Sequence, residues 1–255
     1  MSPPSISSLA LASLIVGCGG DLKLGSDVLW WTDHETGDLT AWLAAPGGGP
    51  HLDDAGSTVA ISAAQARSGV YSVELTTRER ERDTEGPGLM RRFPDAFPAY
   101  YSTWYFLPLA SRSIDTWTIQ RFDSLAEDDS IELGLELNLR TLRRGELLLE
   151  VFGHDTAILK LPLPDPPPLV PVGRWFHVET FLRPEQNLTG HLSVWLDGRL
   201  VYDLDHATTA TSPDLVWMVC NMAQRVDPPE PQLFVDDAAI SRVRVTPDGV
   251  FEYPQ

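Results

Sequence analysis

The feature that most constrains the fold of this chain is a run of strict alternation over residues 130–140. Ile131 and four leucines take every second position of this run, and Ser, Glu, Gly, Asn and Arg take the positions between them. In an extended strand, successive side chains point to opposite faces of the sheet. We therefore expect residues 130–140 to form a strand with one face buried and the other open to water, as is common in antiparallel sheets.

Shorter runs of the same kind follow in residues 174–182 and 192–196. Asp197-Gly198 joins the second of these to residues 199–202. Asp-Gly between two β-rich runs is typical of a tight hairpin, because a type I′ turn needs positive φ at both central residues. Further β-rich runs cover residues 28–31, 58–62, 70–76, 100–107, 116–122, 146–152, 215–219 and 233–245.

No segment carries a long helical period, and the proline-rich residues 161–171 are expected to cross over the surface because proline cannot donate to a sheet ladder. About a dozen short strands separated by turns are typical of two stacked antiparallel sheets. A length of 255 residues with 43% apolar content is enough for one such core. The sequence therefore predicts an all-β, two-sheet antiparallel sandwich in a single domain.

The formal net charge of −17 is spread along the chain rather than gathered in a tail. Such a field repels phosphate backbones, so nucleic acid is not an expected partner. The charge also disfavours a polyanionic ligand, unless a local cluster of arginines reverses the sign of the field at the binding site.

The N-terminal residues 1–20 carry no charge, and their apolar run, residues 9–16, is too short to span a bilayer as a helix. The segment Ile15-Val-Gly-Cys18 resembles a bacterial lipobox, in which the cysteine is acylated. This resemblance implies a signal peptide over residues 1–17, a lipidated tether over 18–27 and a β-sandwich domain over 28–255. An ordinary signal peptide, or a buried strand with an incidental cysteine, is the alternative.

If Cys18 is lipidated, Cys220 has no disulfide partner, and its apolar surroundings predict a buried thiol rather than a nucleophile. The expected location is then the bacterial cell envelope, with the chain held to a membrane by its lipid. Gly19 after the cysteine favours, by analogy, the outer membrane or the cell surface. The sequence does not predict an oligomeric state.

Two segments at opposite ends of the chain carry a family resemblance. Residues 32–42, TDHETGDLTAW, are similar to the opening segment of bacterial jelly-roll domains associated with sugars, and residues 233–241, LFVDDAAIS, are similar to their closing strand. Between them, residues 66–75, 101–108, 173–179 and 190–198 stand in the same order as in those domains. Over residues 28–246 the chain resembles the concanavalin A-like sugar-binding and polysaccharide-lyase sandwiches.

In that fold the first and last strands are neighbours, which would gather several carboxylates. Clustered carboxylates suit Ca²⁺, a hard cation that takes oxygen ligands, and related domains often hold a structural calcium there. The alternative is that these groups cap turns or are solvated. The candidate ligands are Asp33, Glu35, Asp38, Asp236 and Asp237.

The resemblance also implies a ligand face on the concave side of one sheet, where aromatic rings stack on sugars and polar groups bind hydroxyls. Each candidate is alternatively an ordinary solvated sheet residue. The candidates expected to share this face are Arg78, Arg80, Gln120, Glu136, Asn138, Arg140, His177, Glu179 and Trp195.

Lyases of this class cleave uronic-acid polymers by β-elimination, which needs a group that neutralises the substrate carboxylate, a base and an acid. If this chain is such an enzyme, Arg78 and Gln120 are the candidate neutralisers and His177 the candidate base. Two features of those lyases are missing. Their catalytic histidine is replaced by Phe122 if the motif is matched by alternation, or by Arg121 if it is matched by adjacency, and residues 216–222 lack their lysine and tyrosine.

Three functions therefore remain open: a membrane-anchored lipoprotein that binds a polysaccharide, a polysaccharide lyase, and a non-catalytic structural module of the envelope. A hydrolase with paired carboxylates is less well supported, because the E-x-D-x-x-E strand of sandwich glucanases is absent. Whether the chain is an enzyme is not decided by its sequence.

Overall fold

The computed structural model describes residues 27–44, 47–52, 56–78, 86–108, 112–113, 117–154, 159–227, 229–249 and 251–252. The predicted signal peptide, Cys18 and nearly all of the tether lie outside these residues, as does Arg80. Within the described ranges, no helix is long and apolar enough to cross a bilayer.

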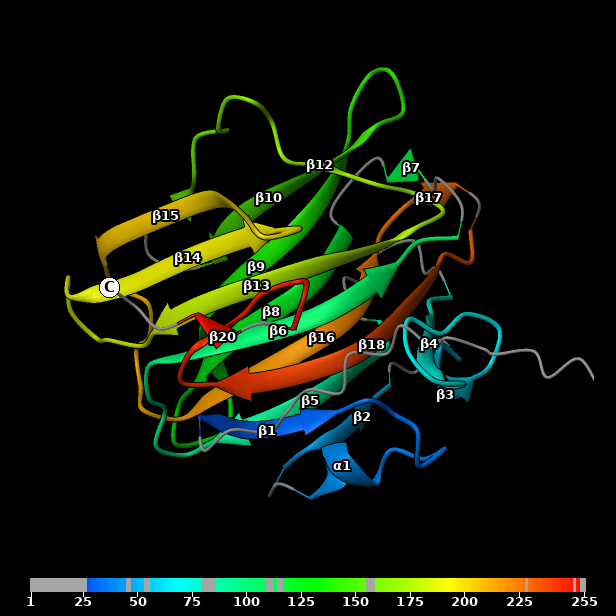
Figure 1. Cartoon of the computed structure of the whole chain (residues 1–255). Helices are drawn as coiled ribbons and strands as arrows, with labels where there is room; N and C mark the ends of the chain where they lie inside the picture. The colour runs from blue at the N-terminus through cyan, green and yellow to red at the C-terminus, as the bar shows by residue number, and fades with distance from the viewer. Residues whose placement is uncertain are drawn as a thin grey trace, which may run out of the picture.

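Two antiparallel sheets stack on each other and account for most of the chain (Figure 1). Sheet A contains β1 (Val28–Thr32), β3 (Thr58–Ser62), β4 (Ser72–Thr76), β6 (Ala99–Phe106), β13 (Trp175–Arg183), β14 (Gly190–Leu196), β15 (Arg199–Ala207) and β18 (Gln232–Ser241). Sheet B contains β2 (Gly49–His51), β5 (Gly88–Phe93), β8 (Trp117–Leu125), β9 (Ile131–Thr141), β10 (Leu147–His154), β11 (Leu159–Lys160), β12 (Leu169–Val170) and β16 (Leu215–Ala223).

The remaining elements are short. One helical turn, α1 (Thr40–Leu43), lies beside the edge strand β2 and its neighbour β5. Two small ribbons pair β7 (Arg112–Ser113) with β17 (Val226–Asp227), and β19 (Arg244–Val245) with β20 (Phe251–Glu252). The predicted all-β jelly-roll sandwich is therefore confirmed.

Several local predictions are also confirmed. The alternating run over residues 130–140 forms β9, and its leucines at 133–139 are buried. Asp197 and Gly198 both have positive φ, 49° and 78°, and connect β14 to β15 as a tight hairpin. The first and last long strands are neighbours, since β1 pairs with β18.

Two stretches differ from the sequence prediction. β5 was not expected, because Gly88, Arg91 and Arg92 leave it without a clear alternation, yet it pairs with β16 along its whole length. Within the proline-rich residues 161–171, expected as a crossover, Leu169 and Val170 form a short pairing with β10.

The core lies between the two sheets and is rich in aromatic side chains. Trp42 from α1 is fully buried, and its ring centroid lies 4.7 Å from that of Trp30 on β1 and 5.7 Å from that of Trp217 on β16. Large aromatic side chains contribute most to the hydrophobic free energy of such a core. This cluster therefore ties the N-terminal segment to both sheets.

The buried side-chain amide of Asn221 also connects the sheets. Asn221 on β16 is fully buried, and its Nδ2 donates to the carbonyl oxygens of Leu75 and Pro231, both at 2.8 Å. Its Oδ1 accepts a 2.8 Å hydrogen bond from Trp117 Nε1. Leu75 belongs to sheet A, whereas Trp117 belongs to sheet B. All the polar atoms of this side chain are thus satisfied.

We expect Asn221→Ala to lower the free energy of unfolding by about 2–4 kcal/mol, because it leaves buried donor and acceptor groups without partners. Urea denaturation measures this change. Asn187→Ala, at an exposed position in a loop of sheet A, is the matched control and should cost less than about 1 kcal/mol. Equal losses in the two variants would show that the Asn221 contacts do not support the fold.

Candidate functional site

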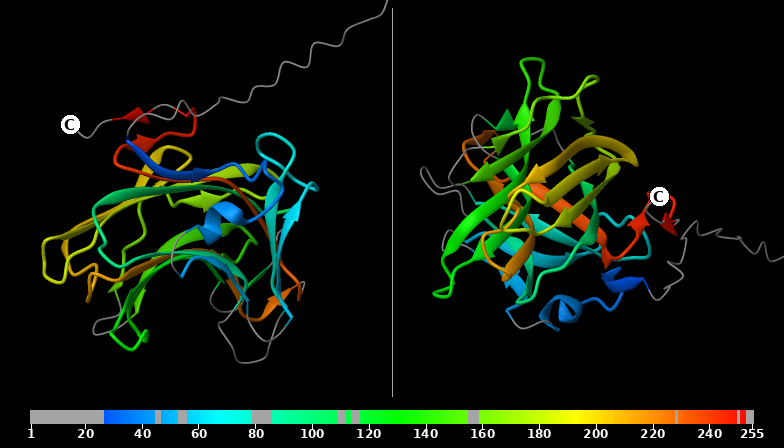
Figure 2. Two further views of the ribbon diagram at one scale, coloured as in Figure 1. Left: turned by 90° about the horizontal axis from the view of Figure 1, so that it is seen from below. Right: turned by 90° about the vertical axis from the view of Figure 1, so that its left-hand side faces the viewer.

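Sheet B is bowed, and its hollow side faces away from sheet A (Figure 2, left). The side chains of β8, β9 and β10 that alternate with the core residues point to this side, because successive residues of a strand face opposite ways. We call this the hollow face. Its polar side chains include Thr118, Arg121, Asp123, Glu136, Asn138, Arg140 and Glu150.

Charged groups on the hollow face are packed into ion pairs. Arg121 Nε lies 2.5 Å from Asp123 Oδ1, and Arg121 Nη1 lies 3.5 Å from Glu136 Oε1. Arg140 Nε lies 2.8 Å from Glu150 Oε1. The three carboxylates have exposed fractions of only 3–5%. Carboxylates with so little exposure need such partners, since an unpaired charge removed from water is costly.

Gly134 makes room for this network. It is paired directly with Asp123 across β8 and β9. A Cβ atom at Gly134 would lie 3.1 Å from Asp123 Oδ1, closer than ordinary van der Waals contact, and 3.5 Å from Arg121 Nη2. The glycine inside this otherwise regular strand is therefore explained by the close approach of the Arg121–Asp123 ion pair.

Asn138 occupies the centre of the polar rows, opposite Thr118 on one side and Glu150 on the other. Its Nδ2 donates to Glu136 Oε2 at 3.3 Å. Its Oδ1 is buried and has no hydrogen-bond partner among the described residues. A buried acceptor of this kind is an available position for the hydroxyl group of a ligand.

A group of sulfur-containing side chains continues the hollow face on β16 and β5. Met218 is paired opposite Arg121 on one side and Met90 on the other, so the group borders the ion pairs directly. Cys220 is buried, as predicted, and forms no disulfide with a described residue. Burial raises the pKa of its thiol well above its usual range. We call this group the sulfur patch; it consists of Met90, Met218, Cys220 and Met222.

The predicted gathering of nine ligand residues on one face is wrong. Glu136, Asn138 and Arg140 do lie together on the hollow face. His177, Glu179 and Trp195 belong to β13 and β14, which are strands of sheet A. Alternation shows which residues of a strand share a face, but it does not show to which sheet the strand belongs.

Two of the predicted lyase residues also lie elsewhere. Gln120 points between the sheets, where its Nε2 donates to Thr180 Oγ1 at 3.0 Å and its Oε1 accepts from Tyr105 Oη at 3.2 Å. A register shift between Thr118 and Gln120 turns it inward. Arg78, just after β4, is 61% exposed and lies 3.4 Å from Glu230. Arg78, Gln120 and His177 therefore do not share a site.

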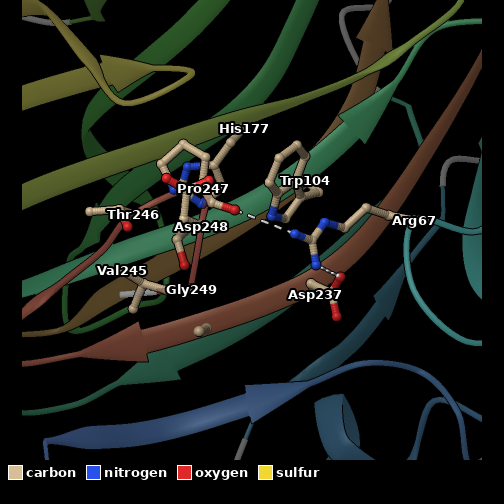
Figure 3. Close-up of a pocket in the computed structure, with 11 residues that line it drawn as sticks. Arg67, Trp104, His177, Asp237, Val245, Thr246, Pro247, Asp248 and Gly249 are labelled. Atoms are coloured by element: carbon tan, nitrogen blue, oxygen red, sulfur yellow. Dashed lines mark hydrogen bonds and ion pairs between the residues drawn. The ribbon is translucent and has the colours of Figure 1, made fainter. Parts of the chain in front are cut away.

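The outer face of sheet A carries a cavity of about 240 Å³ (Figure 3). Trp104 and His177 form its floor, and residues 245–249 form one wall. Arg67 lies over the Trp104 ring at 4.2 Å and donates to Asp237 Oδ2 at 2.9 Å. The C-terminal segment thus covers part of this face.

The same C-terminal segment contacts the other two predicted ligand residues of sheet A, Glu179 and Trp195. Glu179 is fully buried and accepts hydrogen bonds from Arg244 Nε at 2.9 Å and from the backbone N–H of Val245 at 2.6 Å. The Arg244 guanidinium lies 4.4 Å from the centre of the Trp195 ring. Both side chains are therefore held by internal contacts.

His177 is unsuited to act as a base at neutral pH. The side chain is 2% exposed, and burial, together with the positive charges of Arg67 and Arg244, lowers its pKa to about 3. An efficient general base has a pKa near the working pH. His177 thus remains neutral but too weakly basic for proton abstraction.

The carboxylates predicted to bind calcium are engaged by donors of the chain itself. Asp236 Oδ2 accepts from Arg67 N at 2.9 Å, and Glu35 Oε1 accepts from the backbone N–H groups of Val70 and Tyr71 at 2.8 Å. Within the described ranges, no group of three His, Cys, Asp or Glu side chains is placed to hold a metal ion. This donor set does not fit Ca²⁺, and calcium stays an untested prediction. The five carboxylates are Asp33, Glu35, Asp38, Asp236 and Asp237.

Comparison with known proteins shows which solved structures share this fold. No family model matches the chain, and no curated protein matches it in sequence. Solved structures do match. An endo-β-1,4-glucuronan lyase from the fungus Trichoderma reesei superposes with a TM-score of 0.60 at 14% identity, covering 84% of this chain and 95% of that one.

Two further structures agree with this match. The cellulose-induced protein Cip1 gives a TM-score of 0.57 at 17% identity, covering 85% and 98% of the two chains. An alginate lyase from Aplysia kurodai gives 0.55 at 11% identity, covering 84% and 98%. The predicted resemblance to concanavalin A-like, polysaccharide-lyase-type jelly rolls is therefore confirmed for the fold.

The buried His177 generates a prediction about acid stability. Below about pH 6.5 the unfolded chain binds a proton at this residue while the folded chain does not, so acid favours unfolding down to about pH 3. We expect this group to remove about 2–3 kcal/mol of unfolding free energy between about pH 6.5 and about pH 4.5.

Urea denaturation at both pH values should show a smaller loss for His177→Asn than for the wild type. His206→Asn, at an 82% exposed side chain, should keep the wild-type loss. If His177→Asn lost as much unfolding free energy as the wild type, the acid sensitivity would not come from His177.

Proposed function

We propose that this chain binds a polysaccharide along the hollow face of sheet B. The observation that carries the proposal is the polar network on this face, in which nearly buried charges and an unpartnered Asn138 acceptor lie beside the sulfur patch. Polar groups fixed by neighbouring contacts bind a ligand with little loss of conformational entropy. Closely spaced donors and acceptors suit sugar rings, which present many hydroxyl groups.

The structural matches support a carbohydrate ligand. They include glucuronan and alginate lyases, and one alginate lyase with a TM-score of 0.53 was crystallised with an alginate trisaccharide. Because their sequence identity to this chain is low, these proteins support the proposal through their shared fold only.

Polysaccharide cleavage by β-elimination is the second candidate, and the lyases among the structural matches favour it. The side chains described on the hollow face of β5, β8, β9 and β16 include neither a histidine nor a tyrosine that could transfer a proton. β10 ends at His154, whose side chain lies outside the described residues. Binding without cleavage therefore fits the described residues better. An increase in absorbance from unsaturated uronate products would favour the lyase instead.

We expect Asn138→Ala to weaken polysaccharide binding about five- to tenfold, because the variant loses one side-chain hydrogen bond to the ligand. Affinity electrophoresis measures the change, using whichever polysaccharide of a panel retards the wild-type protein. Asn187→Ala, in a loop of sheet A, is the matched control and should bind like the wild type. If Trp195→Ala abolished retardation while Asn138→Ala did not, the site would lie on sheet A.

We further propose that the domain acts at the bacterial cell envelope, anchored by a lipid on Cys18. This proposal is supported by the apolar N-terminal run and the lipobox-like residues before the cysteine. The net charge of −17 favours a lipid anchor over direct adsorption to anionic membranes.

We expect Cys18→Ser to move the protein from the membrane fraction to the soluble fraction and to abolish incorporation of labelled fatty acid. Fractionation of a bacterial host that expresses the full chain measures both effects. Cys220→Ser is the control, since this thiol is buried in the domain and should not affect labelling. Labelling that persists in Cys18→Ser would contradict the anchor.

A further inference from the structure

The cavity on the outer face of sheet A has the form of a second, smaller binding site. It lies between β6, β13 and β18 on one side and residues 245–249 on the other, and it measures about 240 Å³ (Figure 3). Of the lining residues that the structure describes, none belongs to sheet B. A ligand bound there would therefore be independent of the polysaccharide proposed for the hollow face.

The imidazole of His177 is the unsatisfied group of this cavity. The side chain is 2% exposed, and Figure 3 shows it reaching from β13 toward the wall formed by residues 245–249. A neutral imidazole carries one hydrogen-bond donor and one acceptor. Its Nδ1 has no partner among the residues that the structure describes, and an unsatisfied buried polar group costs about 1–3 kcal/mol. A ligand that forms a hydrogen bond with the ring would recover part of this cost.

The other polar groups of the cavity are fixed by the chain itself. Arg67 lies over the Trp104 ring at 4.2 Å, and its Nη1 donates to Asp237 Oδ2 at 2.9 Å. Its Nη2 donates to the carbonyl oxygen of Pro247 at 3.4 Å, which joins the floor of the cavity to its wall. The rings of Trp104 and His177 are in contact, with centroids 5.1 Å apart. A cavity whose groups are already held in place binds a ligand with little loss of conformational entropy.

A bulge in β18 brings Asp237 to this cavity. The register of β18 against β6 shifts between Asp236 and Ala239, and Asp237 has a positive φ of 45°. Bulges redirect side chains and are common beside functional sites. The regular ladder is thus interrupted at the residue whose carboxylate holds Arg67 over the cavity floor.

The volume of the cavity limits the size of its ligand. An apolar cavity of about 150 Å³ holds benzene, whereas pockets for drug-sized molecules measure about 300–1,000 Å³. A cavity of about 240 Å³ lies between these limits. It therefore admits one six-membered ring together with its polar substituents.

The lining favours a ligand that carries hydroxyl groups. Because a hydroxyl group both donates and accepts, it pairs with His177 in either tautomer, whereas a carboxylate only accepts. Asp248, an exposed residue of the wall, adds an acceptor for a second hydroxyl group. Trp104 and Pro247 add apolar surface for the carbon atoms of a ring. A six-membered ring with several hydroxyl groups is the chemistry of an uncharged sugar.

We propose that this cavity binds one uncharged sugar ring, with a hydroxyl group hydrogen-bonded to His177 and another to Asp248. The ring comes either from a free monosaccharide or from the end unit of a glycan chain. An internal unit of a polysaccharide does not fit, because the volume admits a single ring.

Saturation-transfer NMR on the full chain tests the proposal, with D-glucose, D-galactose, D-mannose and D-xylose as probes. We expect at least one of these sugars to bind with a Kd of about 1–10 mM. Tetrahydropyran, the same ring without hydroxyl groups, should not bind. Binding of no sugar by the folded protein, or equal binding of tetrahydropyran, would overturn the proposal. For a sugar that binds, its disaccharide distinguishes the sources: equal affinity indicates a chain end, and weaker binding indicates a free monosaccharide.

His177→Phe keeps an aromatic ring and removes both ring nitrogens. We expect it to weaken sugar binding about tenfold and to keep the wild-type melting temperature, because Nδ1 has no described partner to lose. His206→Phe, at an 82% exposed side chain, is the matched control and should bind like the wild type. Wild-type affinity in His177→Phe would place the sugar elsewhere and overturn the proposal.

Asp248→Ala carries the test if His177→Phe does not fold. Asp248 is exposed in the wall of the cavity, so its removal should leave the fold intact and weaken sugar binding about three- to tenfold. Asp205→Ala removes the same charge at a half-exposed position on β15 and should bind like the wild type. Equal affinities of these two variants would overturn the proposal.

Discussion

The hollow face and the core both depend on the two-residue period of β8, β9 and β16. In β9, the leucines at 133–139 fill the core, and Glu136 and Asn138 point the other way. A register slip of one residue would place the carboxylate in the core and the leucines in water, so the hydrophobic effect fixes the register strongly. The same alternation therefore determines the fold and the position of the polar groups.

Much of the architecture could be predicted from the sequence because it follows from local pattern. The alternation of β9 and the Asp197-Gly198 hairpin are both present in the structure. The neighbouring first and last strands, which the family resemblance implied, are present too. The membership of each strand in a sheet could not be predicted, because it depends on contacts between residues far apart in the chain. Glu136 and His177 both point outward from their strands, but from different sheets.

Local irregularities account for the other differences. A register shift after Thr118 turns Gln120 between the sheets, and no feature of the sequence marks that bulge. The sulfur patch did leave a signal, since Met218, Cys220 and Met222 are spaced two residues apart and so share one face of β16. The contribution of Met90 depends on the pairing of β5 with β16, which propensity alone did not indicate.

The outer faces of the two sheets differ in how their polar groups are satisfied. On sheet A, the C-terminal segment binds Glu179 through Arg244 and Val245, and it lines the cavity above His177. On sheet B, ion pairs form within the sheet itself, and the Asn138 acceptor has no partner among the residues that the structure describes. Buried ion pairs seldom improve stability over apolar packing, so folding stability alone does not explain the ion pairs of the hollow face.

The most direct test of this account is hydrogen–deuterium exchange of the full chain, with and without a polysaccharide that it binds. Binding to the hollow face predicts slower exchange in β8 and β9, with little change in β13 and residues 244–249. Slower exchange confined to β13 and the C-terminal segment would place the ligand on sheet A and contradict the account.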